Sequence, residues 1–152
     1  MPETAYVFPG QGSQRVGMGQ DLFNEFPSAK RVFQQVDEAL GFPLSRLCFE
    51  GPAEELKQTI NAQPAVFTVS LACLEAARES LGLALPLPSR VAGHSLGEYT
   101  ALVAGGALGL GEGARLVRER GRLMQEAGEK DRGGMTAVLG MESAVLEGVC
   151  RD

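Results

Sequence analysis

The sequence predicts an α/β protein built on a parallel sheet, and three observations support this class. A short apolar run, Ala5 to Phe8, stops at Pro9-Gly10, which is typical of a buried strand that leads into a loop. A second apolar pair, Val91-Ala92, is followed at once by a glycine-rich turn. Helical apolar spacing fills much of the chain between and after these strands, and such alternation favours a parallel sheet.

Prolines, acidic residues and apolar spacing predict the helices. Pro27 suits the first turn of a helix that runs to about Leu40, since the N–H that proline lacks is not needed there. Residues 51–56 combine a proline with two acidic residues, which favours a second helix start. Pro64 is expected to open a longer helix that ends near Gly82. Further helices are predicted at about 98–104, 112–127 and 143–150.

The composition of the chain changes near residue 130. Charged residues cluster with glycines over 128–134, and a strand is expected from Met135 to Leu139. We therefore predict a core over residues 1–130, and we expect residues 131–152 to begin a smaller subdomain.

Composition and charge exclude several classes of protein. With 44% hydrophobic and 22% charged residues, the chain falls in the range of folded globular proteins. A formal net charge of −5 argues against a binder of nucleic acid or of anionic membranes. Three scattered cysteines without a CxxC pair, and one histidine, make no metal site. No secretory signal or membrane span is visible in the sequence, so a cytoplasmic location is expected.

The segment Gly93-His94-Ser95-Leu96-Gly97 fits the G-x-S-x-G pattern of a nucleophile elbow. It lies between a predicted strand and a predicted helix, where such a turn raises a serine hydroxyl to the top of a sheet. Glycines on both sides avoid collisions with neighbouring backbone. The following helix offers unpaired N–H groups to a developing oxyanion. The alternative is an ordinary tight turn.

A second glycine loop follows the first predicted strand, at Gly10-Gln11-Gly12-Ser13-Gln14. A dinucleotide fingerprint would need glycine at Arg15, and a phosphate-binding loop would need lysine at Met18. Both cofactor interpretations are excluded. The loop presents Gln11 and Gln14 on the side where open α/β sheets bind ligands, unless it is simply a polar turn.

Arg120 lies inside an apolar stripe of the helix predicted over 112–127. The other members of the stripe are Gly113, Leu116, Val117, Leu123, Met124 and Ala127. An arginine on such a line needs a partner, because an unpaired buried charge is costly. Two interpretations stay open: a structural ion pair with an acid such as Glu98, or a guanidinium that awaits a ligand carboxylate.

Several short motifs together resemble the malonyl-CoA:acyl carrier protein transacylases of fatty acid synthesis. They occur in the order of that family and extend over the whole chain: Phe8–Gln14, Gly51–Leu56, Gln63-Pro64, Gly93–Tyr99, Arg120-Gly121 and Met124-Gln125. The acyltransferase domains of polyketide synthases and animal-type fatty acid synthases are similar.

The resemblance implies a role for each of the residues above. Ser95 would accept malonyl from malonyl-CoA and pass it to the phosphopantetheine thiol of acyl carrier protein. The backbone N–H groups of Gln11 and Leu96 would form the oxyanion hole, and Arg120 would bind the malonyl carboxylate. No cofactor is implied, since malonyl-CoA is a substrate.

The resemblance also implies a hydrolase-like α/β core with a smaller ferredoxin-like insert, of which 131–152 would be the first part. The family's catalytic histidine lies beyond Asp152. His94 is expected to point away from the Ser95 hydroxyl, because adjacent side chains of an extended strand face opposite sides. We therefore expect the chain to be a fragment of the enzyme that lacks its base. The alternatives are a serine esterase or thioesterase, or an inactive remnant that binds the carrier protein.

Overall fold

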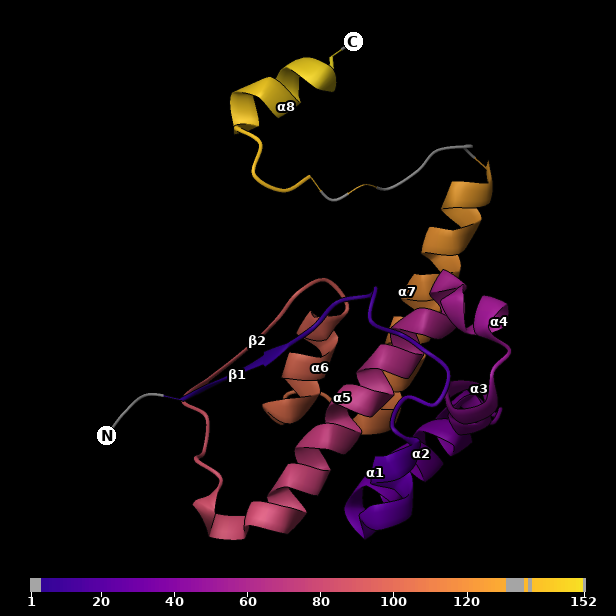
Figure 1. Ribbon diagram of the computed structural model, residues 1–152, viewed down its shortest axis with the longest axis vertical. Coiled ribbons are helices and arrows are strands. Elements are labelled where there is room, and N and C mark those ends of the chain that lie inside the picture. The colour runs from indigo at the N-terminus through magenta and orange to yellow at the C-terminus, as the bar shows by residue number, and fades with distance from the viewer. Residues whose placement is uncertain (1–3, 131–135, 137, 152) are drawn as a thin grey trace.

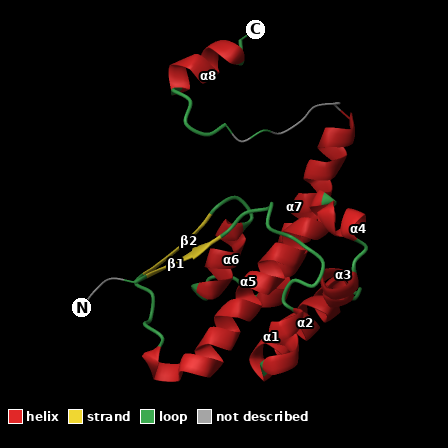
Figure 2. Ribbon diagram, in the orientation of Figure 1, coloured by secondary structure: helices red, strands yellow, loops and turns green. Residues whose placement is uncertain are grey.

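The computed structural model describes residues 4–130, 136 and 138–151 of the chain. Its sheet consists of β1 (Ala5–Phe8) and β2 (Arg90–Gly93), which pair in parallel with Ala5 opposite Arg90 (Figure 2). Both predicted strands and their parallel pairing are therefore confirmed. Among the described residues, β1 pairs with β2 alone.

Helices make up most of the described chain. Their bounds are α1 Gln20–Glu25, α2 Pro27–Leu40, α3 Leu44–Glu50, α4 Ala53–Lys57, α5 Thr59–Leu81, α6 Gly97–Ala104, α7 Leu110–Lys130 and α8 Ser143–Val149, with a 3-10 turn at Gly82–Ala84. Figure 1 shows α5 between two groups of elements, with the sheet and α6 on one side and α2 and α7 on the other. None of the described helices is both long and apolar enough to cross a lipid bilayer.

The main difference from the predicted helices concerns α5. The helix begins at Thr59, five residues before Pro64, so Pro64 lies inside it. Proline there leaves the carbonyl of Ile60 without its helical donor, and the Thr68 hydroxyl donates to the Pro64 carbonyl at 2.7 Å. The short helices α1 and α3 were not predicted, because neither shows a long apolar period.

The strand predicted over 135–139 is not formed by the residues that can be checked. Thr136, Val138 and Leu139 belong to no strand, while Met135 and Ala137 lie outside the described residues. The helix predicted after it is present as α8, which contains no buried residue.

The hydrophobic core lies among the helices. Phe33, Phe67 and Leu44 are fully buried in it. Phe23, Phe33 and Phe49 meet edge to face with ring centroids 5.0–5.8 Å apart, which is a favourable aromatic geometry. The aromatic contacts fasten α1, α2 and α3 together, beside α5.

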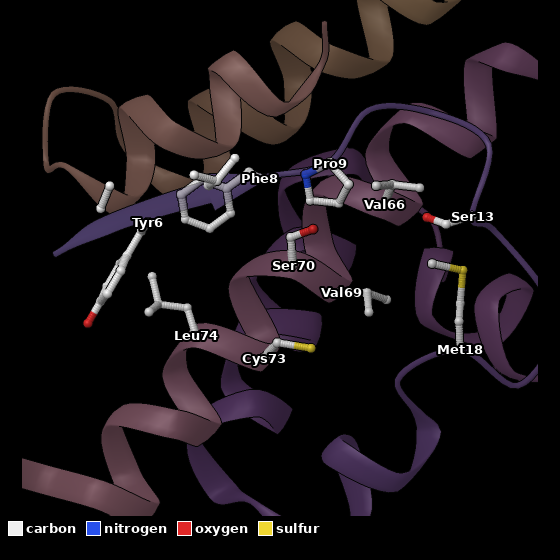
Figure 3. A pocket seen from close by; sticks show the side chains of 12 residues that line it. Tyr6, Phe8, Pro9, Ser13, Met18, Val66, Val69, Ser70, Cys73 and Leu74 are labelled. Carbon is white, nitrogen blue, oxygen red and sulfur yellow. The ribbon is translucent and has the colours of Figure 1, made fainter. Parts of the chain in front are cut away.

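Among the residues that the structure describes, helices cover the two-stranded sheet on one face only. Val91 lies beside Gly105 at the end of α6. Val7 and its partner Ala92 project to the opposite face, where Val7 is 73% exposed. Beside β1, an apolar pocket of about 560 Å³ separates the strand from α5 (Figure 3). Tyr6 and Phe8 of β1 and Leu74 of α5 contribute to its lining.

Candidate active site

Ser95 lies in a tight turn between β2 and α6. β2 ends at Gly93 and α6 begins at Gly97, so three residues connect them. Ser95 has φ of 56°, the only positive φ among the described non-glycine residues. A side chain in this left-handed region costs about 1–3 kcal/mol and persists only where the surroundings enforce it. The turn therefore holds Ser95 in a strained conformation.

The glycines on either side of this turn have no room for a side chain. A Cβ on Gly93 would lie 2.0 Å from the carbonyl carbon and oxygen of Gly97, and one on Gly97 would lie 2.5 Å from the carbonyl oxygen of Phe8. The Gly97 N–H also donates to the His94 carbonyl at 2.9 Å. The backbone is thus folded so closely that only glycine fits at both positions.

Two backbone N–H groups beside Ser95 have no partner within the described chain. Neither the N–H of Leu96 nor that of Gln11 donates a hydrogen bond to another described residue. Leu96 directly follows the serine, and Gln11 lies in the loop after β1, which lines the same cavity as Ser95. Donors of this kind can bind an anionic oxygen.

Arg120 reaches this turn from α7. Its Nη2 donates to the Ser95 Oγ at 2.9 Å, and its Nη1 donates to the Gln63 Oε1 at 2.6 Å. Among the residues that the structure describes, no carboxylate lies within ion-pair distance of Arg120. The predicted alternative of an ion pair with Glu98 is therefore wrong. The guanidinium keeps its positive charge without a counter-charge in the described chain.

These groups line a cavity of about 420 Å³. Its walls come from the loop after β1, the start of α5, the turn after β2, the middle of α7 and Thr136: Gln11, Gly12, Gln14, Thr59, His94, Ser95, Arg120, Met124 and Thr136. The predicted residues Gln11, Ser95 and Arg120 are thus brought together, although up to 109 positions separate them in sequence.

His94 lines the cavity but makes no side-chain hydrogen bond to Ser95. Its Nδ1 lies next to Gly10, where a Cβ would approach it to 2.6 Å. No hydrogen bond joins the His94 ring to the Ser95 hydroxyl. This arrangement agrees with the expectation that His94 is not the base. No other histidine occurs in the chain.

Sequence reasoning missed the roles of Gln63 and Thr59. Gln63 is fully buried and contacts Arg120, and the Thr59 hydroxyl lies 3.5 Å from the Gln11 amide nitrogen. Because the predicted helix began at Pro64, both residues were expected to precede it. Gln63 was noted only as part of the Gln63-Pro64 motif, and its contact with Arg120 could have been found by asking what lies opposite Arg120 on the neighbouring helix.

Comparisons with known proteins assign this chain to a family. Residues 5–149 match the family model described as the acyl transferase domain. A malonyl CoA-acyl carrier protein transacylase of Bacillus subtilis (strain 168) is 51% identical over 98% of this chain and 46% of its own length. The protein of the same name from Escherichia coli (strain K12) is 42% identical over 100% of this chain and 48% of its own length. The chain spans about half the length of the curated relatives it matches.

Solved structures of proteins with the same kind of name share the fold of this chain. An acyl-carrier-protein-S-malonyltransferase from Bartonella henselae superimposes with a TM-score of 0.85 and 42% identity, over 99% of this chain and 48% of its own. A malonyl-transacylase solved in complex with a type II polyketide synthase acyl-carrier protein superimposes with a TM-score of 0.76 and 46% identity. This match covers 83% of this chain and 40% of that one. The family model covers most of the chain, and the relatives and the matched α/β fold agree with it, so the chain belongs to the acyl transferase domain family.

Proposed function

We propose that this chain supplies the serine nucleophile, the oxyanion donors and the carboxylate-binding arginine of a malonyl-CoA:acyl carrier protein transacylase. The observation that supports this most directly is the position of Arg120, whose guanidinium has no carboxylate partner among the described residues and lies 2.9 Å from the Ser95 hydroxyl. An acyl group attached to Ser95 would meet a cation at once. A carboxylate on that acyl group satisfies the guanidinium better than a neutral group does.

The proposed reaction has two acyl transfers. The Ser95 Oγ attacks the thioester carbonyl of malonyl-CoA, a C–O bond forms, the C–S bond breaks, and coenzyme A leaves as a thiol with the serine proton. The phosphopantetheine thiol of the carrier protein then attacks the serine ester: a C–S bond forms, the C–O bond to Ser95 breaks, and the thiol proton passes to the Ser95 oxygen. The strand-turn-helix around Ser95 acts as a nucleophile elbow.

The negative oxygen of each tetrahedral intermediate would be bound by the Leu96 and Gln11 N–H groups. Their lack of partners within the described chain supports this assignment. A preorganised donor of this type typically contributes about 100- to 1,000-fold to the rate. No step requires a cofactor.

The base that accepts the Ser95 proton is assigned to a residue outside these 152 residues. Serine at its ordinary pKa is a weak nucleophile. The relatives are about twice as long as the chain, and the resemblance implies that their base lies in the half that it does not match. The proposed ferredoxin-like insert would begin in residues 131–152 and continue in that half.

A serine hydrolase is the competing function, with water in place of the carrier thiol. Arg120 favours a transferase that handles an acidic acyl group. The names of the relatives also favour transfer. An inactive carrier-binding remnant is not favoured either, because the strained Ser95 is retained beside Arg120.

The test uses residues 1–152 joined to the part of the Bacillus subtilis relative that this chain does not match, which we call the joined enzyme. It is incubated with malonyl-CoA and acyl carrier protein, and malonyl-carrier and free malonate are quantified by mass spectrometry. Transfer faster than hydrolysis is expected. Release of free malonate without malonyl-carrier would overturn the proposal.

A further inference from the structure

Gln63 connects Arg120 to the interior of the helical core. It lies in the second turn of α5 and its side chain is fully buried. Its Oε1 accepts the hydrogen bond from Arg120 Nη1 at 2.6 Å, and its Nε2 donates to the Met124 Sδ at 3.2 Å. A continuous series of hydrogen bonds therefore connects Met124, Gln63, Arg120 and Ser95.

The orientation of the Gln63 amide follows from the chemistry of its neighbours. A guanidinium has donors only, so the group that faces Arg120 must be the amide oxygen. A thioether has acceptor capacity only, so Met124 suits the amide nitrogen on the other side. The two α7 residues, four positions apart, therefore fix a single orientation of Gln63.

The crossing of α5 and α7 brings Gln63 close to Arg120. A Cβ on Gly121 would lie 2.6 Å from the Thr59 carbonyl oxygen and 2.9 Å from the Ile60 Cα, so α5 and α7 are in backbone contact there. Any side chain at position 121 would push the helices apart. Because the two backbones approach so closely here, the short side chain of Gln63 on α5 can accept a hydrogen bond from Arg120 on α7.

We propose that Gln63 is a positioning residue that directs the Arg120 guanidinium toward Ser95 and leaves its charge available for the carboxylate of the acyl group. This inference rests on the proposed function. The guanidinium of Arg120 is partly buried and therefore needs a partner, and two classes of partner could hold it. A carboxylate would hold it and also neutralise it, whereas an amide oxygen holds it by a hydrogen bond and adds no charge.

The matching experiment replaces Gln63 by an isosteric acid. In the joined enzyme, Gln63→Glu is expected to lower kcat/KM for malonyl transfer by about tenfold or more, because the new carboxylate competes with the malonyl carboxylate for Arg120. Acetyl transfer, which needs no carboxylate site, should change little. Gln63→Leu removes the hydrogen bond without adding charge and should raise the malonyl KM, again with a smaller effect on acetyl.

Gln125→Glu is the matched control. Gln125 also lies on α7 at the crossing with α5, where its Oε1 accepts the Ile60 N–H at 3.3 Å, but it does not line the cavity. The same change of amide to acid should leave the ratio of malonyl to acetyl transfer unaltered there. Equal losses of malonyl and acetyl transfer in both Gln63 variants would assign Gln63 a structural role and overturn the inference.

A second measurement needs no activity. In the 152-residue chain, NMR titration of Gln63→Glu should give the introduced carboxyl group a pKa below the ordinary value of about 4.3, because Arg120 favours its charged form. In Gln63→Glu combined with Arg120→Ala, burial alone should raise that pKa above it. Equal pKa values in the two variants would contradict the contact between residue 63 and Arg120.

Failure of the proposed function is recognised separately, because Arg120→Ala would then leave the ratio of malonyl to acetyl transfer unchanged.

Discussion

The guanidinium of Arg120 donates a hydrogen bond of 2.9 Å to the hydroxyl of Ser95, which lies 25 positions earlier in the sequence. One residue lies in the middle of α7 and the other in the turn that follows β2. The contact puts a positive charge directly beside the atom that we propose as nucleophile. If Ser95 is acylated as proposed, we expect selectivity for acyl groups that offer this cation a partner.

Replacement of Ser95 by alanine in the joined enzyme should abolish the malonyl adduct. The hydroxyl is the atom to which the acyl group binds, and alanine leaves the turn without a nucleophile. Intact-protein mass spectrometry after addition of malonyl-CoA measures the adduct directly. Ser80→Ala, at an exposed position of α5, is the control and should keep it. A malonyl adduct that persists on Ser95→Ala would show that another residue is acylated.

Replacement of Arg120 by alanine should lower malonyl transfer far more than acetyl transfer. Loss of one partner of a desolvated charge pair costs about 2–5 kcal/mol, which corresponds to a loss of about 30- to 5,000-fold in malonyl transfer. Acetyl has no carboxylate and should lose little. Competition assays with malonyl-CoA and acetyl-CoA measure the ratio. Arg115→Ala, an exposed arginine of the same helix, is the control, and an equal loss for both acyl groups would contradict the assignment.

The sequence predicted the site better than it predicted the fold around it. Ser95 and its flanking glycines could be recognised because a short turn leaves a local pattern. Arg120 could be singled out because a charge within an apolar stripe violates the helical period. Its partner Gln63 could not, since that contact spans 57 positions and depends on a helix crossing that no local pattern encodes. The ion pair with Glu98 was wrong for the same reason: spacing along one helix does not say which helix lies opposite.

Replacement of Gly93 by alanine should destabilise the chain by about 3 kcal/mol or more. Its new methyl group would lie 2.0 Å from the backbone of Gly97, which cannot move aside as a flexible side chain could. Gly128→Ala in α7 meets nothing within 4 Å and has a helical backbone, so it should stabilise by about 0.4–1 kcal/mol. Urea denaturation of the three proteins measures both shifts. A Gly93→Ala variant as stable as the original would mean that the turn is looser than described.

The three cysteines should react with a thiol reagent at very different rates. Burial, and to a lesser degree the nearby Asp37 carboxylate, raise the pKa of the Cys48 thiol to about 12. At pH 8 the reactive thiolate of Cys48 is then only about one part in 10,000. Cys150 and Cys73 are exposed, although burial of the thiol raises the pKa of Cys73. Peptide mapping after brief iodoacetamide treatment should find Cys150 modified first, Cys73 more slowly, and Cys48 only in denaturant.

The 152-residue chain alone should show little or no transacylase activity. Within its described residues no base reaches the Ser95 hydroxyl, and general base catalysis is typically worth about 100- to 10,000-fold. The open face of the sheet, with Val7 73% exposed, should also favour self-association of the isolated chain. The measurement is malonyl transfer to a carrier protein by the chain, with the joined enzyme assayed in parallel. Turnover by the chain equal to that of the joined enzyme would show that His94, or another group in the cavity, can act as the base. The assignment of the base to a residue outside the chain would then be wrong, while the roles of Ser95 and Arg120 would still be tested by their own variants.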